Sequence, residues 1–170
     1  MLTSSLAIDN NHRKRWLSLL AQADIQSLEN VCVGLGEWMN VPFQWIRPPE
    51  TGLVMVRGRI GGSGSKFNVG ELSITRCAIR LDVSSSTQSM GMGWVKGKNP
   101  RHAEMVARLD ALLQVPDYFE KIMATVIEPI AAEIAQKNDQ MAKKTASTKV
   151  DFYTLARQSQ VDPAIDKKDI

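Results

Sequence analysis

The sequence predicts an α+β fold, in which an antiparallel sheet of about four to five strands is flanked by N-terminal and C-terminal helices. Residues 42–97 alternate apolar and polar side chains in short runs, which is typical of half-buried strands. The segments on both sides repeat their apolar residues at helical spacing. Turn residues divide the central region, including the run GGSGS at residues 61–65.

The composition indicates one ordinary globular domain. The chain has 170 residues, of which 44% are hydrophobic and 23% charged, so it folds without help from disulfides or metals. The formal net charge of +3 is too small to indicate nucleic-acid binding. The first residues, MLTSSLAID, hold no apolar run of the length that a signal peptide needs, so we expect neither a leader peptide nor a membrane span, and Cys32 and Cys77 lack CxxC spacing. We therefore expect a cytoplasmic protein with no nucleic-acid or membrane partner.

Two helices are expected before the sheet. Asp9 or Asn10 caps the first helix, and Asp24 caps the second. Glycines weaken helices, so the second helix should end near Gly34 and Gly36. The apolar stripes consist of Trp16, Leu17, Leu20 and Ala23 in the first helix and Leu28, Val31, Cys32 and Leu35 in the second.

The first strands follow from Pro42. PFQWIR reads as a short strand closed by Pro48-Pro49, since proline cannot serve a central ladder. A second strand, LVMVRGRI, leads into the glycine turn. The run FNVGELSITRCAIRLD is long for one strand and its apolar parity slips, which predicts irregularities near Gly70-Glu71 and Thr75-Arg76.

The last strand, MGMGWVKG, has two different faces. Met90, Met92 and Trp94 share one face, whereas the glycines share the other with Val95. A face lined by glycine indicates that something lies very close to it, either a packed helix or a bound partner.

Helices return after the sheet. Asn99-Pro100 is an N-cap followed by proline at the first helical position. Glu104 and Arg108 lie four residues apart in that helix and can pair. Pro129 interrupts the next helix and predicts a kink near Thr125. The stripes expected to face the core contain Met105, Val106, Leu109, Leu112 and Leu113, and then Phe119, Ile122, Met123, Val126, Ile127, Ile130 and Ile134.

The organisation predicted from this pattern is one α+β domain over residues 1–136, followed by a segment over residues 137–170. That segment begins as a polar linker and continues as an apolar hook, VDFYTLA. An apolar segment after a polar linker needs a surface to dock on, either in this domain or on another subunit. The residues expected to dock are Phe152, Tyr153 and Leu155.

The chemistry that the residues favour is anion or partner binding. Guanidinium groups bind phosphate oxygens bidentately, and successive glycine amides form anion-binding nests. The alternative is that the arginines pair with carboxylates such as Glu50 or with those of a partner. No catalytic nucleophile is predicted. No metal site is expected either, because His102-Ala103-Glu104 lacks the PCxxC of zinc deaminases. The candidate substrate-binding or partner-binding residues are Arg57, Arg59, Gly61, Gly62, Gly64, Lys66, Glu71, Arg76, His102 and Glu104.

Several of these residues lie in motifs that resemble the PhnG family, a subunit of the carbon–phosphorus lyase core complex. The resemblance runs in order from Arg13-x-x-Trp16 to VDFYTLAR. Between these it includes ETGLVMVRGRIGGSGSKFNVGE, TRCAIRL, GWVKG and HAEMVARLDALL. Two departures are visible: Ser63 replaces a common threonine, and Lys98 replaces a common arginine, which removes a bidentate donor. The matching positions are Glu50, Gly52, Arg57, Gly61, Gly62, Gly64, Phe67, Gly70, Glu71, Thr75, Arg76, His102, Ala103 and Glu104.

The resemblance implies a non-radical subunit of a phosphonate-degrading complex. Such a complex forms α-D-ribose 1-methylphosphonate 5-triphosphate from an alkylphosphonate and MgATP, which is its substrate, with no intrinsic cofactor in this chain. A nucleosidase-type subunit is the partner expected first, and a separate radical, iron–sulfur subunit cleaves the carbon–phosphorus bond. The resemblance assigns no catalytic residue to this chain, and activity of the chain alone is not expected.

Three hypotheses follow from the sequence. The chain is a structural and activating subunit, a contributor of phosphate-binding residues to a shared active site, or a free-standing anion-binding module. The apolar hook makes the third less favourable. A sheet edge and a hook left without their partner predict that the isolated chain forms a homodimer.

Overall fold

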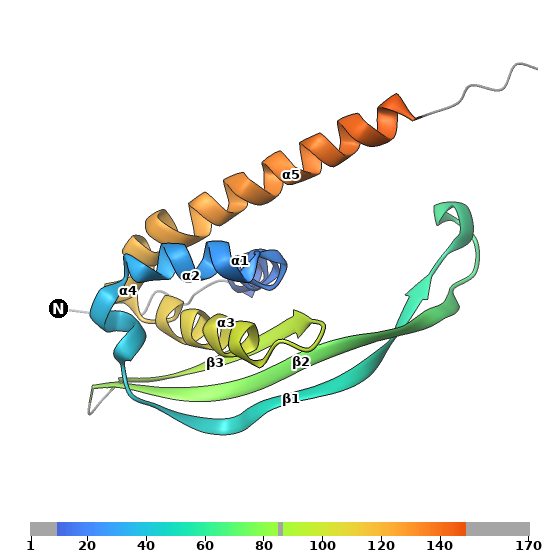
Figure 1. Ribbon diagram of the computed structural model, residues 1–170. Helices are drawn as coiled ribbons and strands as arrows, with labels where there is room; N and C mark the ends of the chain where they lie inside the picture. The colour runs from blue at the N-terminus through green and yellow to red at the C-terminus, as the bar shows by residue number, and fades with distance from the viewer. Residues whose placement is uncertain (1–9, 85–86, 149–170) are drawn as a thin grey trace, which may run out of the picture.

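The computed structural model describes residues 10–84 and 87–148 and confirms the α+β class (Figure 1). Within these residues three antiparallel strands form one sheet in the order β1-β2-β3, fewer than the four to five predicted. The strands are β1 (Phe43–Gly58), β2 (Phe67–Ser84) and β3 (Thr87–Lys96). The helices are α1 (Asn10–Gln22), α2 (Ile25–Val33), α3 (Pro100–Leu113), α4 (Pro116–Ile122) and α5 (Glu128–Ser147), with short turns η1 (Gly36–Asn40), η2 (Ile60–Gly62) and η3 (Met123–Ile127).

The strand count is lower because β1 continues through Pro48-Pro49. The register moves from Arg47 opposite Ala78 to Glu50 opposite Arg76, so the two prolines form a bulge. A bulge in an edge strand tolerates proline, because the missing N–H groups have no second neighbour to bind. The prediction of two separate strands on either side of the prolines is therefore wrong.

Of the two irregularities predicted in β2, the first is present and the second is not. Val56 lies opposite Gly70 and Arg57 opposite Asn68, which leaves Val69 as an extra residue beside the predicted Gly70-Glu71 position. The register is regular through Thr75-Arg76, so the second predicted irregularity is wrong. The bulges that bend this part of the sheet lie in the neighbouring β1 instead.

Two of the predicted helix caps, Asp24 and Asn99, are confirmed, whereas Asp9 lies outside the described residues. The Asp24 carboxylate accepts hydrogen bonds from Gln26 N at 3.0 Å and Ser27 N at 3.3 Å. The Asn99 side chain accepts from His102 N at 3.1 Å, and Pro100 occupies the first helical position. Helix α2 ends at Val33, next to Gly34, as expected.

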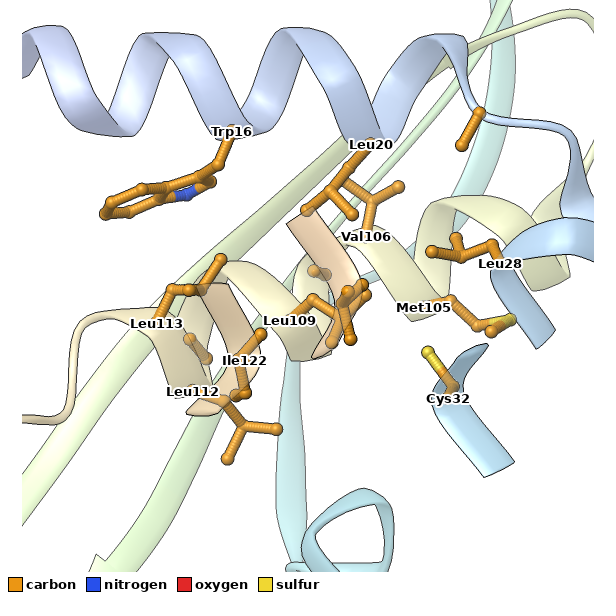
Figure 2. Packing of buried hydrophobic residues seen from close by; sticks show 14 of the residues in the cluster. Trp16, Leu20, Leu28, Cys32, Met105, Val106, Leu109, Leu112, Leu113 and Ile122 are labelled. Atoms are coloured by element: carbon orange, nitrogen blue, oxygen red, sulfur yellow. The ribbon is translucent and has the colours of Figure 1, made fainter. Parts of the chain in front are cut away.

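The core lies between the sheet and the outer helices, with α3 at its centre (Figure 2). Helix α3 packs directly on β2 and β3, and α1 and α4 pack on α3. Trp16 and Leu20 of α1 and Leu28 and Cys32 of α2 reach the same cluster. All five α3 residues predicted to face the core are buried: Met105, Val106, Leu109, Leu112 and Leu113.

Two glycines of β3 bring α3 onto the sheet. A Cβ atom at Gly91 would lie 1.8 Å from Ala107 O, and one at Gly93 would lie 1.9 Å from Ala103 O. Any larger side chain would push the helix away from the strand. The close neighbour that the glycine face predicted is therefore a packed helix.

The C-terminal helices show the predicted interruption. Pro129 has no N–H to donate, and the turn η3, which contains Thr125, is π-helical. Helix α5 then continues through Ser147, so residues 137–147, predicted to be a polar linker, are helical and exposed (Figure 1). Phe152, Tyr153 and Leu155 lie outside the described residues. Within the described ranges, the search for a helix with the length and apolar character of a membrane span finds no candidate.

Candidate interaction surface on the open side of the sheet

The helices cover one side of the sheet, and the other side is open to solvent (Figure 1). Trp94 is 49% exposed, and Met90 and Met92 beside it on β3 are similarly exposed. We call this side the open face and define it by Ile46, Arg47, Glu50, Arg76, Ala78, Arg80, Met90, Met92 and Trp94. Exposed apolar side chains next to arginines are typical of protein interfaces.

Arg76 lies at the centre of the open face. Its Nε donates to Glu50 Oε1 at 2.7 Å, and its guanidinium carbon lies 5.5 Å from the centroid of the Trp94 ring. Arg47 Nη1 approaches the same Glu50 oxygen at 3.4 Å. Two cations therefore share one carboxylate and leave an excess positive charge. These groups are about half exposed, so the ion pairs are weak and an incoming anion can compete with Glu50.

The open face is hollowed beside this cluster. Ile46, Met90 and Trp94 line a shallow depression of about 330 Å³ together with Arg47 and Arg76. Apolar walls with two guanidinium groups suit an apolar side chain flanked by carboxylates or another anion.

The far end of the β1–β2 hairpin carries a second group of predicted residues. Arg59 Nη1 donates to Gly64 O at 2.8 Å, which ties the glycine turn to the strand. Gly62 has a φ of +79°, a conformation that glycine adopts without strain. Among the described residues, neither Arg57 nor Lys66 forms an ion pair, so both charges are free at this end.

The structure does not bring Arg76 to the glycine turn. Arg57 lies opposite Asn68, whereas Arg76 lies opposite Glu50, seven residues earlier on β1. Seven residues of strand span about 23 Å. Glu71, opposite Met55, lies between them. The predicted set therefore divides into a hairpin-end group and a central group on the open face.

His102 and Glu104 lie in α3, on the covered side of the sheet. The His102 ring is 7% exposed, and its Nε2 contacts Leu20 O at 2.8 Å. A carbonyl oxygen accepts hydrogen bonds, so Nε2 donates and fastens α3 to α1. Glu104 pairs with Arg108 at 3.0 Å, as predicted from their spacing. These contacts hold the fold together and place neither residue at the hairpin end or on the open face.

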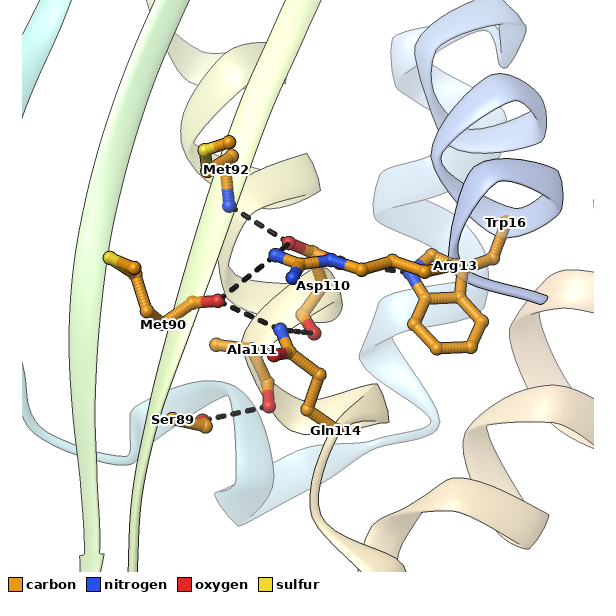
Figure 3. Close-up of polar contacts among 8 residues, drawn as sticks. All are labelled: Arg13, Trp16, Ser89, Met90, Met92, Asp110, Ala111 and Gln114. Carbon is orange, nitrogen blue, oxygen red and sulfur yellow. Dashed lines mark hydrogen bonds and ion pairs between the residues drawn. The ribbon is translucent and has the colours of Figure 1, made fainter. Parts of the chain in front are cut away.

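Sequence reasoning missed Asp110, a fully buried carboxylate at the centre of a cluster of hydrogen bonds (Figure 3). Its Oδ1 accepts from Arg13 Nε at 3.1 Å and Trp16 Nε1 at 2.9 Å. Its Oδ2 accepts from Arg13 Nη2 at 2.7 Å and Met92 N at 2.9 Å. The signal in the sequence was a carboxylate inside the apolar stripe of a predicted helix.

The Asp110 cluster also closes one edge of the sheet. Strand β3 is an edge strand, and Met90 O accepts from both Arg13 Nη2 and Gln114 Nε2. Met92 N is bound by Asp110. Side chains therefore replace a neighbouring strand along this part of β3, which protects the edge from pairing with another chain.

Neither cysteine is suited to chemistry. Burial raises the pKa of the Cys32 thiol, and that of Cys77, to about 11. A protonated thiol is a poor nucleophile and a poor metal ligand. Across residues 10–84 and 87–148, no cluster of three or more histidine, cysteine, aspartate or glutamate side chains is placed to hold a metal ion.

Comparison with known proteins gives two findings. The sequence model of the family described as "Phosphonate metabolism protein PhnG" matches residues 11–158. A curated protein of Rhizobium meliloti (strain 1021), alpha-D-ribose 1-methylphosphonate 5-triphosphate synthase subunit PhnG, is 37% identical over 145 residues. The aligned region covers 85% of this chain and 88% of that protein. The match therefore extends over nearly all of both chains.

Proposed function

The chain belongs to the PhnG family of phosphonate metabolism proteins, and from this premise we propose that it is a subunit of an α-D-ribose 1-methylphosphonate 5-triphosphate synthase. The observation that carries the proposal is the 37% identity to such a subunit over nearly its whole length. In this role the chain helps to form the named compound from MgATP and an alkylphosphonate. MgATP is a substrate of the complex, and the chain needs no cofactor of its own.

We assign the chain a structural and activating role in that complex. The open face supports this assignment, because its Trp94, methionines and arginines are residue types enriched at protein interfaces. Its partners are the other subunits of the carbon–phosphorus lyase core complex, first among them the nucleosidase-type subunit. The two free, buried thiols suit the reducing cytoplasm, where we place the complex.

Capture of the other subunits tests this proposal. Tagged full-length chain, co-expressed with the remaining synthase subunits of its own organism, is expected to retain them through affinity and size-exclusion steps. The control is an unrelated tagged protein of similar net charge. Recovery of the chain free of every other subunit would contradict the proposal.

The same experiment locates the hook. A chain truncated before Val150 keeps all the described helices and strands, since α5 ends at Ser147. If Phe152, Tyr153 and Leu155 dock on a partner, the truncated chain captures less of it than the full chain does. Equal capture would assign the hook to this fold and leave the open face as the principal contact.

Arg76→Ala separates a structural subunit from a direct contributor to the active site. The substitution removes the Glu50 ion pair and the Trp94 contact, which are half exposed, so the chain should stay folded. With a structural role, assembly weakens and turnover per assembled complex stays within about twofold of wild type. Intact assembly with lost turnover would instead show that Arg76 binds phosphate or phosphonate. Arg101→Ala is the matched control, because Arg101 lies on α3, away from the open face, and forms an exposed ion pair with Glu29.

We also propose that the isolated chain forms a homodimer, since apolar side chains left without a partner favour self-association. A monomeric mass from light scattering at micromolar concentration would contradict this.

A further inference from the structure

We propose that the end of the β1–β2 hairpin, residues 53–73, is a docking arm that inserts into a groove of another subunit with apolar walls bearing carboxylates. This proposal rests on the proposed function, and it identifies the part of the chain that binds another subunit of the complex. The arm extends beyond the helices that cover the rest of the sheet (Figure 1). Its two strands are paired with each other from Leu53 opposite Ser73 to Gly58 opposite Phe67.

The arm exposes apolar side chains that its own fold does not cover. Ile60 is 78% exposed and Leu53 63% exposed, although both are aliphatic. Alternate residues of a strand point to opposite faces. Met55 and Val56 are neighbours and both are exposed, so neither face of the arm is covered at this point. A two-stranded ribbon of this kind is marginally stable in water by itself. The exposed large apolar residues of the arm are Leu53, Met55, Val56, Ile60, Phe67 and Val69.

The charge of the arm indicates the chemistry of its partner. Residues 53–73 contain three cations, Arg57, Arg59 and Lys66, and one acidic residue, Glu71. Among the described residues Arg57 and Lys66 have no carboxylate partner, and Arg59 is bound to a backbone carbonyl. An apolar surface with three cations matches a groove whose apolar walls carry carboxylates.

Contacts within the arm also fix its conformation before it binds a partner. Gly58 packs so closely on Val69 that a Cβ at Gly58 would lie 2.8 Å from Val69 Cγ2. The Arg59–Gly64 bond and the Gly64 N to Ile60 O bond at 3.4 Å fix the turn. A preordered loop loses less conformational entropy on binding, which favours insertion as a unit.

A second copy of the chain does not suit this surface. A symmetric contact would bring together two arms that each carry three cations and a single carboxylate, Glu71, so that two surfaces with an excess of positive charge face each other. Like charges at an interface disfavour association. The occupant is therefore a different, acidic subunit.

Binding measurements on full-length chain and the remaining synthase subunits test the arm. Arg57→Glu combined with Lys66→Glu should raise the dissociation constant at least about 30-fold, and Ile60→Ser about tenfold. The charge-matched control is Lys14→Glu with Lys144→Glu, both exposed and distant from the arm. The apolar control is Val33→Ser, since Val33 is 79% exposed, like Ile60. Both controls should bind within about twofold of wild type.

The outcomes separate the arm from the proposed function. Weakened binding by both arm variants, with circular dichroism unchanged, supports the arm, and added salt should then weaken wild type more than the charge variant. Normal binding by the arm variants while wild type is captured overturns the arm and leaves the proposed function standing. Normal binding with lost turnover also overturns it, because the cations would then face substrate. Wild-type chain that binds no subunit overturns both.

Discussion

Asp110→Ala is expected to lower the free energy of unfolding by about 3–5 kcal/mol, because it removes the fully buried carboxylate that binds the partly exposed Arg13 and leaves buried donors unpaired. Asp110 is fully buried and accepts four hydrogen bonds, from Arg13 twice, Trp16 and Met92 N. After the substitution the Trp16 N–H and Met92 N–H lose their acceptor inside the protein. Each buried donor left unpaired costs about 1–3 kcal/mol.

Urea denaturation of the isolated chain measures this effect. Asp110→Asn keeps the size of the side chain and one acceptor oxygen, so its loss should lie between wild type and Asp110→Ala. Asp82→Ala is the matched control: Asp82 is 37% exposed and pairs with Arg80 at only 3.8 Å, and the change should stay below about 1 kcal/mol. A loss of the same size for Asp82→Ala and Asp110→Ala would refute the structural role of the cluster.

Gly93→Ala is the second substitution with a large expected effect. The added methyl group would overlap Ala103 O at 1.9 Å. This oxygen belongs to the backbone of α3, so the overlap cannot be relieved by a change of side-chain rotamer. Helix α3 has to shift away from β3, and the tightly packed core around Leu109 is strained. Such overpacking costs about 1–3 kcal/mol, and more when a backbone has to move.

Gly52→Ala is the matched control for this prediction. Gly52 also lies in a strand, but a Cβ there has no neighbour within 4 Å and no positive φ is recorded. Alanine at this position should be neutral or stabilise by about 0.5 kcal/mol. Thermal melts of the two variants give the comparison. Equal melting temperatures would show that α3 does not need glycine at position 93.

The parts of the fold predicted from the sequence depend on neighbours close along the chain. Asp24 and Asn99 cap helices through residues two or three positions away, and Pro129 interrupts the helix that contains it. The predicted number of strands is too high because the prediction ends a strand at Pro48-Pro49. A proline pair ends a central strand but is tolerated in an edge strand. Whether a strand lies at the centre or at the edge depends on the order of the strands in the sheet. That order is a long-range property, which the local sequence pattern does not contain.

The candidate site was predictable by residue type but not by position. Arg57 and Arg76 both lie in strand patterns, yet β1 and β2 are long enough to hold them far apart. Asp110 was missed because its partners come from positions 94 to 97 residues earlier in α1 and from β3. Gly91 and Gly93 correctly indicated a close neighbour, although the pattern left open whether it was a helix or a partner.

In the function proposed above, this chain is a required subunit of an α-D-ribose 1-methylphosphonate 5-triphosphate synthase and has no activity alone. The most direct measurement is formation of that product from MgATP and methylphosphonate by the remaining subunits, with and without the full-length chain. We expect no product without the chain, recovery when it is added in equal amount, and no product from the chain alone. Undiminished product formation in its absence would contradict the claim.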